Sequence, residues 1–163
     1  MITVGIITAS DKGAAGERED KSGAAVAELA AGMGWAVRAA DIVPDEPEAL
    51  RAKMIYQADT LGLDIIFTTG GTGFSPRDIT PEATLAVVER LAPGIPEAMR
   101  LESMKITPRA MLSRAVAGIR GRTLIINLPG SPKAVRECLG AVLPALAHGV
   151  EILTGKSGEC GES

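Results

Sequence analysis

Hydrophobic residues along this chain fall into short, nearly continuous runs that alternate with longer segments of helical periodicity. The short runs predict four strands, over residues 2–8, 36–43, 64–69 and 122–128. The longer segments predict helices over residues 22–33, 46–61, 81–91, 95–104 and 132–153. Runs this continuous are typical of strands buried on both faces of a sheet. The alternation therefore predicts an α/β fold with a mostly parallel sheet and helices on both sides.

The chain has 163 residues, enough for one well-buried core and too few for two ordinary domains. We expect a single domain over residues 1–153 and a loose, flexible tail over residues 154–163, which are rich in Gly, Ser and Glu. Cys138 falls in a helical pattern and Cys160 in that tail, so neither a disulfide framework nor a Cys-x-x-Cys metal site is indicated. A reducing cytoplasm is the expected setting.

Charge and aromatic content argue against nucleic acid as a partner. The net charge is −3, and the aromatic residues are one Trp, one Tyr and two Phe. A nucleic-acid binder would need a basic surface or a platform of aromatic rings. The start of the chain, MITVGIITAS, has no basic leader, and no apolar run approaches the roughly 20 residues that span a bilayer. We expect neither a nucleic-acid nor a membrane partner.

The most informative segment is FTTGGTGFSPRDITPEA, from Phe67 to Ala83. A strand there runs into Gly70-Gly71-Thr72-Gly73, where glycines let the backbone turn sharply and bring its N–H groups close to a ligand. Arg77 and Asp78 follow, and Thr80-Pro81 then opens a helix, with Thr80 as its cap. This order is typical of an anion site at the carboxyl end of a sheet. The alternative is a tight glycine loop without a ligand.

Polar residues also follow the other predicted strands. In open α/β sheets, ligands bind in the crevice beyond the carboxyl ends of the strands. Ala9-Ser10-Asp11 follows the first strand, and Pro44-Asp45-Glu46 follows the second. The last strand leads into Asn127-Leu128-Pro129-Gly130-Ser131-Pro132-Lys133, in which Ser131 is a natural N-cap and Pro132 suits the first helical position. The helix N-terminus and Lys133 would favour an anion, although an ordinary capped helix start is the alternative.

Three carboxylates, Asp20, Asp45 and Asp78, would converge at this edge of the sheet. Carboxylates beside a phosphate site are explained by a divalent cation, because magnesium takes carboxylate and phosphate oxygens as ligands. Each also has a simpler interpretation. Asp45 could cap the helix that follows it, Asp78 could pair with Arg77 or cap locally, and Asp20 could be a solvated loop charge.

Several familiar sites are absent from the sequence. There is neither a GxxxxGK[ST] motif nor a GxGxxG after the first strand, which argues against a P-loop and a Rossmann dinucleotide site. The one histidine, His148, lies deep in the last helical pattern, where a packing or interface role is expected. A nucleophilic triad is therefore disfavoured.

The segments TTGGTG, RD.TPEAT and SRAVAGIRGRTLIINLPGSPKAV resemble the molybdopterin adenylyltransferases of the MogA/MoaB type, a group that includes the N-terminal domain of gephyrin. The resemblance extends from ITVGIITASDKG to HGVEIL, which is nearly the whole chain. The loop GEREDKSG is similar to the family's G…D.SG element through Gly16, Asp20, Ser22 and Gly23.

The resemblance implies a three-layer α/β/α molybdopterin-binding-like fold, usually assembled as a homotrimer. It also implies transfer of an adenylyl group from Mg-ATP to the terminal phosphate of molybdopterin, and contact with the downstream molybdenum-insertion protein. Asp45 and Asp78 fall where the family keeps two important aspartates, and we expect them to be catalytic and to hold Mg²⁺. The residues expected to bind substrate or nucleotide are Ser10, Asp20, Ser22, Gly70, Gly71, Thr72, Gly73, Arg77, Ser113, Asn127, Pro129, Gly130, Ser131 and Lys133.

Two other classes of function remain open at this point. One is a scaffold that holds molybdopterin without turnover. The other is a nucleotide pyrophosphatase on the same fold, which would need no pterin.

Overall fold

Within the part of the chain that the structure describes, six strands form one sheet in the order β2-β1-β3-β6-β5-β4. The computed structural model describes residues 1–156. β1, β2, β3 and β6 are parallel, whereas β5 and β4 continue the sheet in antiparallel pairs. The four parallel strands therefore present their carboxyl ends at one edge. The strands are β1 (Thr3–Ala9), β2 (Ala36–Val43), β3 (Ile65–Thr69), β4 (Arg90–Leu91), β5 (Ala117–Arg120) and β6 (Thr123–Leu128).

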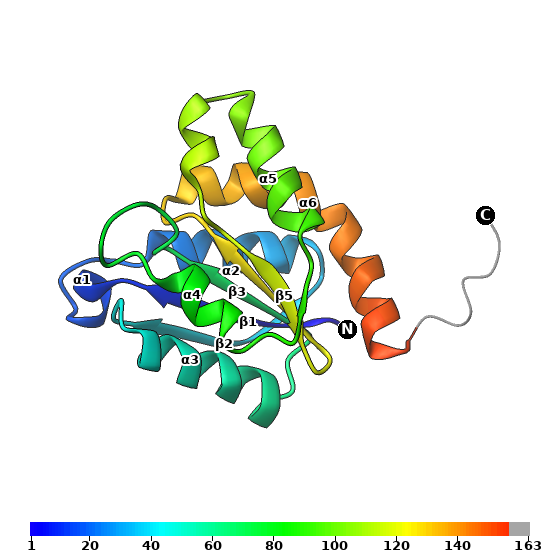
Figure 1. Cartoon of the computed structure of the whole chain (residues 1–163). Coiled ribbons are helices and arrows are strands. Elements are labelled where there is room, and N and C mark those ends of the chain that lie inside the picture. Colours follow the sequence, from blue (N-terminus) through cyan, green and yellow to red (C-terminus); the bar gives the residue numbers. More distant parts are fainter. Residues whose placement is uncertain (157–163) are drawn as a thin grey trace.

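Helices cover both faces of the sheet, and the predicted α/β class is confirmed (Figure 1). α2, α5 and α6 pack on one face, and α3 and α4 pack on the other. The helical segments are α1 (Asp11–Ala14), α2 (Lys21–Gly32), α3 (Pro47–Ile55), the π-helical η1 (Tyr56–Thr60), α4 (Thr80–Leu85), α5 (Gly94–Met104), the 3₁₀-helical η2 (Pro108–Leu112) and α6 (Pro132–Thr154).

Successive residues of the central strands feed two separate cores. Ile6 belongs to the core under α2 and α6, and its neighbour Ile7 belongs to the core under α3 and α4. Phe67 and Ile66 on β3 divide in the same way. Because side chains alternate across a strand, a strand covered on both faces must be apolar at every position. This is why the predicted strands read as continuous hydrophobic runs.

The end and the cap predicted for the helix over residues 81–91 were wrong. The predicted helix over residues 81–91 ends at Leu85, and residues 90–91 form β4, which pairs with Ile119 and Gly118 of β5. Both β4 and β5 were missed because they are only two and four residues long. Thr80 is not a cap either, since α4 starts at Thr80 after the N-cap Ile79.

The predicted helix over 46–61 is divided between α3 and η1.

The last helix extends one residue beyond its predicted end at residue 153. α6 continues through Thr154, which is buried, and ends at the left-handed Gly155 with φ of 70°. The rest of the segment predicted as a tail, from residue 157 onward and including Cys160, lies outside the described residues.

By length and composition alone, the 23-residue α6 could cross a membrane. Its apolar side is occupied, however, because Val135, Leu139, Val142 and Leu146 pack in the same core as β6 and α2. The helix is therefore a core element of this domain. His148, expected in a packing or interface role, is exposed on its outer side.

Asn127, predicted as a ligand-binding residue, is instead completely buried inside the sheet. Its side-chain amide donates to the hydroxyls of Thr68, at 2.9 Å, and Thr84, at 2.8 Å. Its carbonyl oxygen accepts from the backbone N–H of Val116 at 3.2 Å. Asn127 lies on the face of β6 that α4 covers, and its hydrogen bonds join β3, α4 and the segment leading into β5. Its polar atoms are thus used within the fold.

We expect Asn127→Ala to destabilise the domain by about 2–4 kcal/mol, because the substitution leaves several buried polar groups without partners. Urea unfolding measures the change. Lys133→Ala is the control, since the Lys133 side chain is 82% exposed and its removal should change stability by no more than about 0.5 kcal/mol. A loss below about 1 kcal/mol for Asn127→Ala would contradict the role that we give to this network.

Candidate functional site

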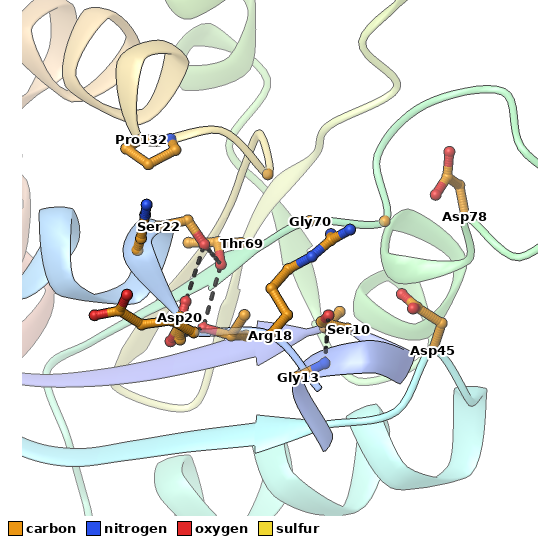
Figure 2. A pocket seen from close by; sticks show the side chains of 16 residues that line it. Ser10, Gly13, Arg18, Asp20, Ser22, Asp45, Thr69, Gly70, Asp78 and Pro132 are labelled. Atoms are coloured by element: carbon orange, nitrogen blue, oxygen red, sulfur yellow. Dashed lines mark hydrogen bonds between the residues drawn. The ribbon is translucent and has the colours of Figure 1, made fainter. Parts of the chain in front are cut away.

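The carboxyl ends of the parallel strands open into a cavity of about 740 Å³ (Figure 2). Its walls come from the end of β1, the charged loop before α2, the loop after β2, the end of β3 and the start of α6. Eight residues predicted from the sequence line it. These are Ser10, Asp20, Ser22, Asp45, Gly70, Gly71, Asp78 and Gly130.

A left-handed turn at Gly70 and Gly71 forms the floor of this cavity. Their φ angles are +85° and +67°, which side chains rarely adopt. A Cβ at Gly70 would lie 2.6 Å from the carbonyl oxygen of Ala9, and one at Gly71 would collide with the Thr80 hydroxyl. The sharp turn expected from the glycines is confirmed. Only glycine lets the chain pass between β1 and α4 at this point.

Asp20 is held firmly at the start of α2 and is not a solvated loop charge. It is the N-cap of the helix, and its carboxylate accepts from the N–H of Gly23 at 2.8 Å. It also accepts from the hydroxyl of Thr8 at 2.7 Å and from that of Ser22 at 3.2 Å. Ser22 in turn contacts Thr69 at 2.9 Å. The bonds of Asp20 and Ser22 therefore connect the start of α2 to the ends of β1 and β3.

Asp45 is tied to Asp11 through a reciprocal pair of hydrogen bonds. The backbone N–H of Asp11 donates to the Asp45 carboxylate, and the N–H of Asp45 donates to the Asp11 carboxylate, each at 3.0 Å. The capping interpretation of Asp45 is wrong, because the N-cap of α3 is Glu46 and the helix has no side-chain capping bond within the described part of the chain. Asp45 therefore lines the cavity as a carboxylate tied to the backbone of α1, and not as the cap of α3.

The ionisation of Asp45 is disfavoured by its surroundings. Burial raises the pKa of its carboxyl, and the negative charges of Asp11 and Asp78 raise it further. The hydrogen bond from Asp11 and the charge of Arg77 act in the opposite direction. Since the charge of Asp78 contributes, the two aspartates are close enough to interact electrostatically.

Arg77 neither pairs with Asp78 nor lines this cavity. Its guanidinium binds the Asp11 carboxylate with two hydrogen bonds, of 2.6 and 3.0 Å, and binds Glu46 at 2.9 Å. This arrangement lowers the pKa of Asp11. The Asp78 carboxylate instead accepts from the N–H of Ser75 at 3.0 Å, which closes a local turn. The prediction that Arg77 faces the ligand is therefore corrected: Arg77 ties its loop to α1.

A second cavity of about 290 Å³ lies on the other side of the glycine turn, between α5, η2 and the start of α6. Four predicted residues line it, and several residues that sequence reasoning missed complete the wall. The predicted residues are Thr72, Gly73, Ser113 and Pro129, and the others include Met99, Arg100, Ser103, Arg109 and Cys138. Burial raises the pKa of the Cys138 thiol. The two cavities adjoin at the turn, because Gly71 faces the first and Thr72 the second.

Two predicted residues at the start of α6 line neither cavity. Ser131 is the N-cap of α6, as expected, and accepts from the N–H of Ala134 at 3.2 Å. Lys133 is largely exposed and lies 3.9 Å from Glu137. Pro132, at the first position of the helix, lines the first cavity instead. The side chains of this segment therefore serve the helix more than the cavity.

Two cations that sequence reasoning missed line the first cavity, namely Arg18 and Lys21. Figure 2 shows Arg18 extended across the cavity toward Gly70. Arg18 forms no ion pair with any carboxylate of residues 1–156. The signal for both residues was their place in the charged loop GEREDKSG, where alternating signs resemble a solvated loop.

The arrangement suits anions that arrive with a cation. Backbone amides of the glycine turn and the N-terminus of α2 attract negative charge, and Arg18 adds a positive one. Among residues 1–156, no group of three or more His, Cys, Asp or Glu side chains is placed to hold a metal. A magnesium ion at Asp45 and Asp78 would thus need oxygen ligands from a substrate, as is usual for Mg²⁺ bound with phosphates.

Comparisons with known proteins agree on one family. The family model described as a probable molybdopterin binding domain matches residues 5–148. The chain is 44% identical to the molybdopterin adenylyltransferase of Helicobacter pylori strain J99, over 94% of this chain and 89% of that protein. It is 36% identical to the Escherichia coli K12 protein of the same name, over 91% and 80%. The crystal structure of the molybdopterin biosynthesis enzyme MoaB from Thermus thermophilus matches with 53% identity and a TM-score of 0.91, over 98% of this chain and 100% of that one.

The pKa shifts of Asp45 and Asp11 predict opposite effects on stability. A raised carboxyl pKa means that ionising Asp45 costs folding free energy, and this cost appears as pH rises above the ordinary value of 3.8. We therefore expect Asp45→Asn to melt at or above the wild-type temperature near pH 7, with the difference vanishing as the pH falls toward about 4.

Asp11→Asn provides the contrast. Because the folded-state pKa of Asp11 is lowered, its ionised carboxylate stabilises the fold above pH 3.8, and this contribution is lost as the pH falls through the folded-state pKa. The Asp11→Asn variant should therefore melt at a lower temperature than wild type near neutral pH. Thermal melts of both variants across pH measure the two signs. A lower melting temperature for Asp45→Asn at neutral pH would contradict the burial argument.

Proposed function

Because this chain belongs to the molybdopterin-binding domain family, we propose that it is a molybdopterin adenylyltransferase. It would transfer AMP from ATP to the terminal phosphate of molybdopterin and release pyrophosphate, a step in molybdenum cofactor biosynthesis. The observation that carries the proposal is the pair of cavities that adjoin at the glycine turn. Two phosphate-bearing substrates can meet there with their phosphates next to the same backbone.

The chemistry requires positioning more than activation. An oxygen of the molybdopterin phosphate attacks the α-phosphorus of ATP, and the bond to the bridging oxygen of pyrophosphate breaks with its electron pair. The nucleophile is already an anion, so no general base is needed. The protein contributes alignment and charge neutralisation.

ATP suits the first cavity. A volume of about 740 Å³ falls in the usual range for small-molecule sites. The amide of Gly71 and the N-terminus of α2 would bind phosphate oxygens, whereas the N–H of Gly70 already donates to the carbonyl of Leu128 at 3.1 Å. Arg18, which reaches across this cavity, would neutralise part of the triphosphate charge. Asp20 accepts bonds within the fold, and in this proposal it orients the helix start.

Molybdopterin suits the second cavity, which is smaller and less polar. Met99 and the buried Cys138 provide apolar walls for a flat ring system. Ser103, Ser113 and Arg100 provide hydrogen-bonding groups for its edge. Thr72 and Gly73 would then lie next to its phosphate, facing the nucleotide across the turn.

Asp45 and Asp78 would hold Mg²⁺ together with substrate phosphates. The residues present fit this ion, because one oxygen of Asp45 accepts a bond from Asp11 and the other accepts none from residues 1–156. Bound there, Mg²⁺ would neutralise charge on the phosphates during transfer.

We also propose that the protein is a cytoplasmic homotrimer that contacts a molybdenum-insertion protein downstream. The apolar side chains left exposed on α5 and η2 support assembly, with Leu101 at 60% and Met111 at 61% exposure. Met99, on the inner side of α5, is buried in the core and does not belong to this surface. A heterologous interface closes into a ring when its rotation is threefold.

Light scattering tests the assembly. We expect three chain masses at micromolar concentration, and we expect Met111→Glu to lower the mass by placing a charge in the apolar surface. Lys133→Glu, in an exposed polar position, should leave it unchanged. A wild-type protein with the mass of one chain would refute the trimer.

Turnover of two aspartate variants tests the activity. We expect Asp78→Asn and Asp45→Asn each to lower molybdopterin-dependent AMP transfer by about 100-fold or more, on the order of 3 kcal/mol in the transition state. Both variants should stay folded, with stability within about 1 kcal/mol of wild type. Glu48→Gln makes the same chemical change at an exposed position on α3 and should retain activity.

The products separate this proposal from its rivals. Radiolabelled ATP is incubated with molybdopterin and Mg²⁺, and adenylylated pterin and pyrophosphate are both measured. A molybdopterin scaffold would bind the pterin without releasing pyrophosphate. A nucleotide pyrophosphatase would cleave its substrate without pterin. Wild-type turnover in both aspartate variants would remove Asp45 and Asp78 from the mechanism.

A further inference from the structure

Arg114 lies between the two cavities and lines neither of them. It follows η2 in the segment that leads into β5, and its side chain is one-third exposed. Arg77 ties the loop over residues 72–78 to α1 from outside, whereas Arg114 contacts it from within. The sequence offers no hint of this role, because Arg114 is more than thirty positions from the residues that it binds.

Four interactions join Arg114 to the loop over residues 72–78 and to α4. Its backbone N–H donates to the carbonyl of Thr72 at 2.8 Å. Its guanidinium donates to the carbonyl of Gly73 at 2.8 Å and to that of Asp78 at 2.7 Å. It also forms an ion pair with Glu82 in the first turn of α4, which lowers the pKa of that carboxyl. One side chain thus holds the loop at its beginning and at its end.

The rest of this loop is weakly supported from inside. Phe74, Ser75, Pro76 and Arg77 are exposed. The internal bonds are those between Ser75 and Asp78, at 2.9 and 3.0 Å. These bonds close the turn locally but do not attach it to the body of the domain. The attachment on the inner side comes from Arg114.

The residues on either side of Arg114 belong to the wall of the second cavity. Ser113 and Ala115 line it, and their carbonyls accept from the guanidinium of Arg100 at 3.4 and 2.9 Å. Arg100 lines the same cavity from α5. Hydrogen bonds at both ends of the segment 113–115 therefore connect α5, through the wall of the second cavity, to the backbone of Asp78, which lines the first.

We propose that Arg114 is a positioning residue, which fixes the orientation of the Asp78 carboxylate relative to a ligand in the second cavity. This inference rests on the proposed adenylyl transfer. Arg114 acts through Asp78, because its own polar groups are used by Gly73, Asp78 and Glu82. A misplacement of about 1 Å between reacting groups costs on the order of 100-fold in rate, so loss of this support should appear in turnover.

Two substitutions at Arg114 and one control separate positioning from binding. Arg114→Met removes the donors and keeps much of the volume, and Arg114→Lys retains the charge with a different donor geometry. Arg120→Met is the control, since Arg120 likewise donates to a backbone carbonyl, that of Val87, and pairs with a carboxylate, that of Asp59, but lines neither cavity. We expect kcat for Arg114→Met to fall about 10- to 100-fold, with KM for ATP and for molybdopterin changed less than about threefold. Arg114→Lys should recover part of kcat.

A double-mutant cycle with Asp78→Asn distinguishes positioning from a general structural effect. If Arg114 acts through Asp78, adding Arg114→Met to Asp78→Asn should lower kcat by less than about twofold more. Glu82→Gln removes only the ion pair with Arg114 and is the second variant if Arg114→Met does not fold. It should lower kcat, and its effect should likewise be non-additive with that of Asp78→Asn. Additive losses, or a loss confined to KM, would overturn the proposal.

The same cycle keeps this inference apart from the proposed function. If Asp78→Asn retains wild-type transfer, the assignment of Asp78 fails and with it the route by which Arg114 acts. If Asp78→Asn is impaired and Arg114→Met keeps wild-type kcat, adenylyl transfer stands and the positioning role is wrong.

Discussion

The left-handed turn at Gly70 and Gly71 is the constraint on which the rest of the site depends. It ends β3 and carries the chain between β1 and α4 through a space too narrow for a side chain at either position. Because the turn is so tight, residues only one position apart face different cavities. The boundary between the two proposed substrates is therefore a piece of backbone, next to which a phosphate can lie on either side.

Negative charge collects around this turn, and the fold restrains each carboxylate with donors of its own. Asp20 caps α2, Asp45 accepts from the backbone of Asp11, and Asp78 accepts from Ser75. These bonds orient the carboxylates without neutralising them, and burial makes Asp45 costly to ionise. In the proposed reaction, a cation bound together with an anionic substrate would relieve this repulsion. The site is in this sense complete only with its ligands, which fits a reaction between two phosphates.

Side-chain placement near the site could be predicted only where local sequence dictates it. Ser131 caps α6 because a cap depends on the next three residues. Arg77 was expected to face the ligand, and it pairs instead with Asp11, which is 66 positions away. Asn127 follows the same pattern, since its partners lie on β3, α4 and the segment before β5. For long polar side chains, the partner is chosen by tertiary neighbours.

The sequence by itself determined the parallel strands, their order of appearance, the glycine turn and the edge of the sheet at which polar residues meet. These features follow from periodicity, from buried apolar runs and from backbone preferences, all of which act over a few residues. Only the tertiary structure decided that the glycine turn separates two cavities, that Arg18 crosses the first, and that Arg114 holds the loop of Asp78. Those outcomes depend on contacts between segments far apart in the chain, whose geometry is set when the helices pack onto the sheet.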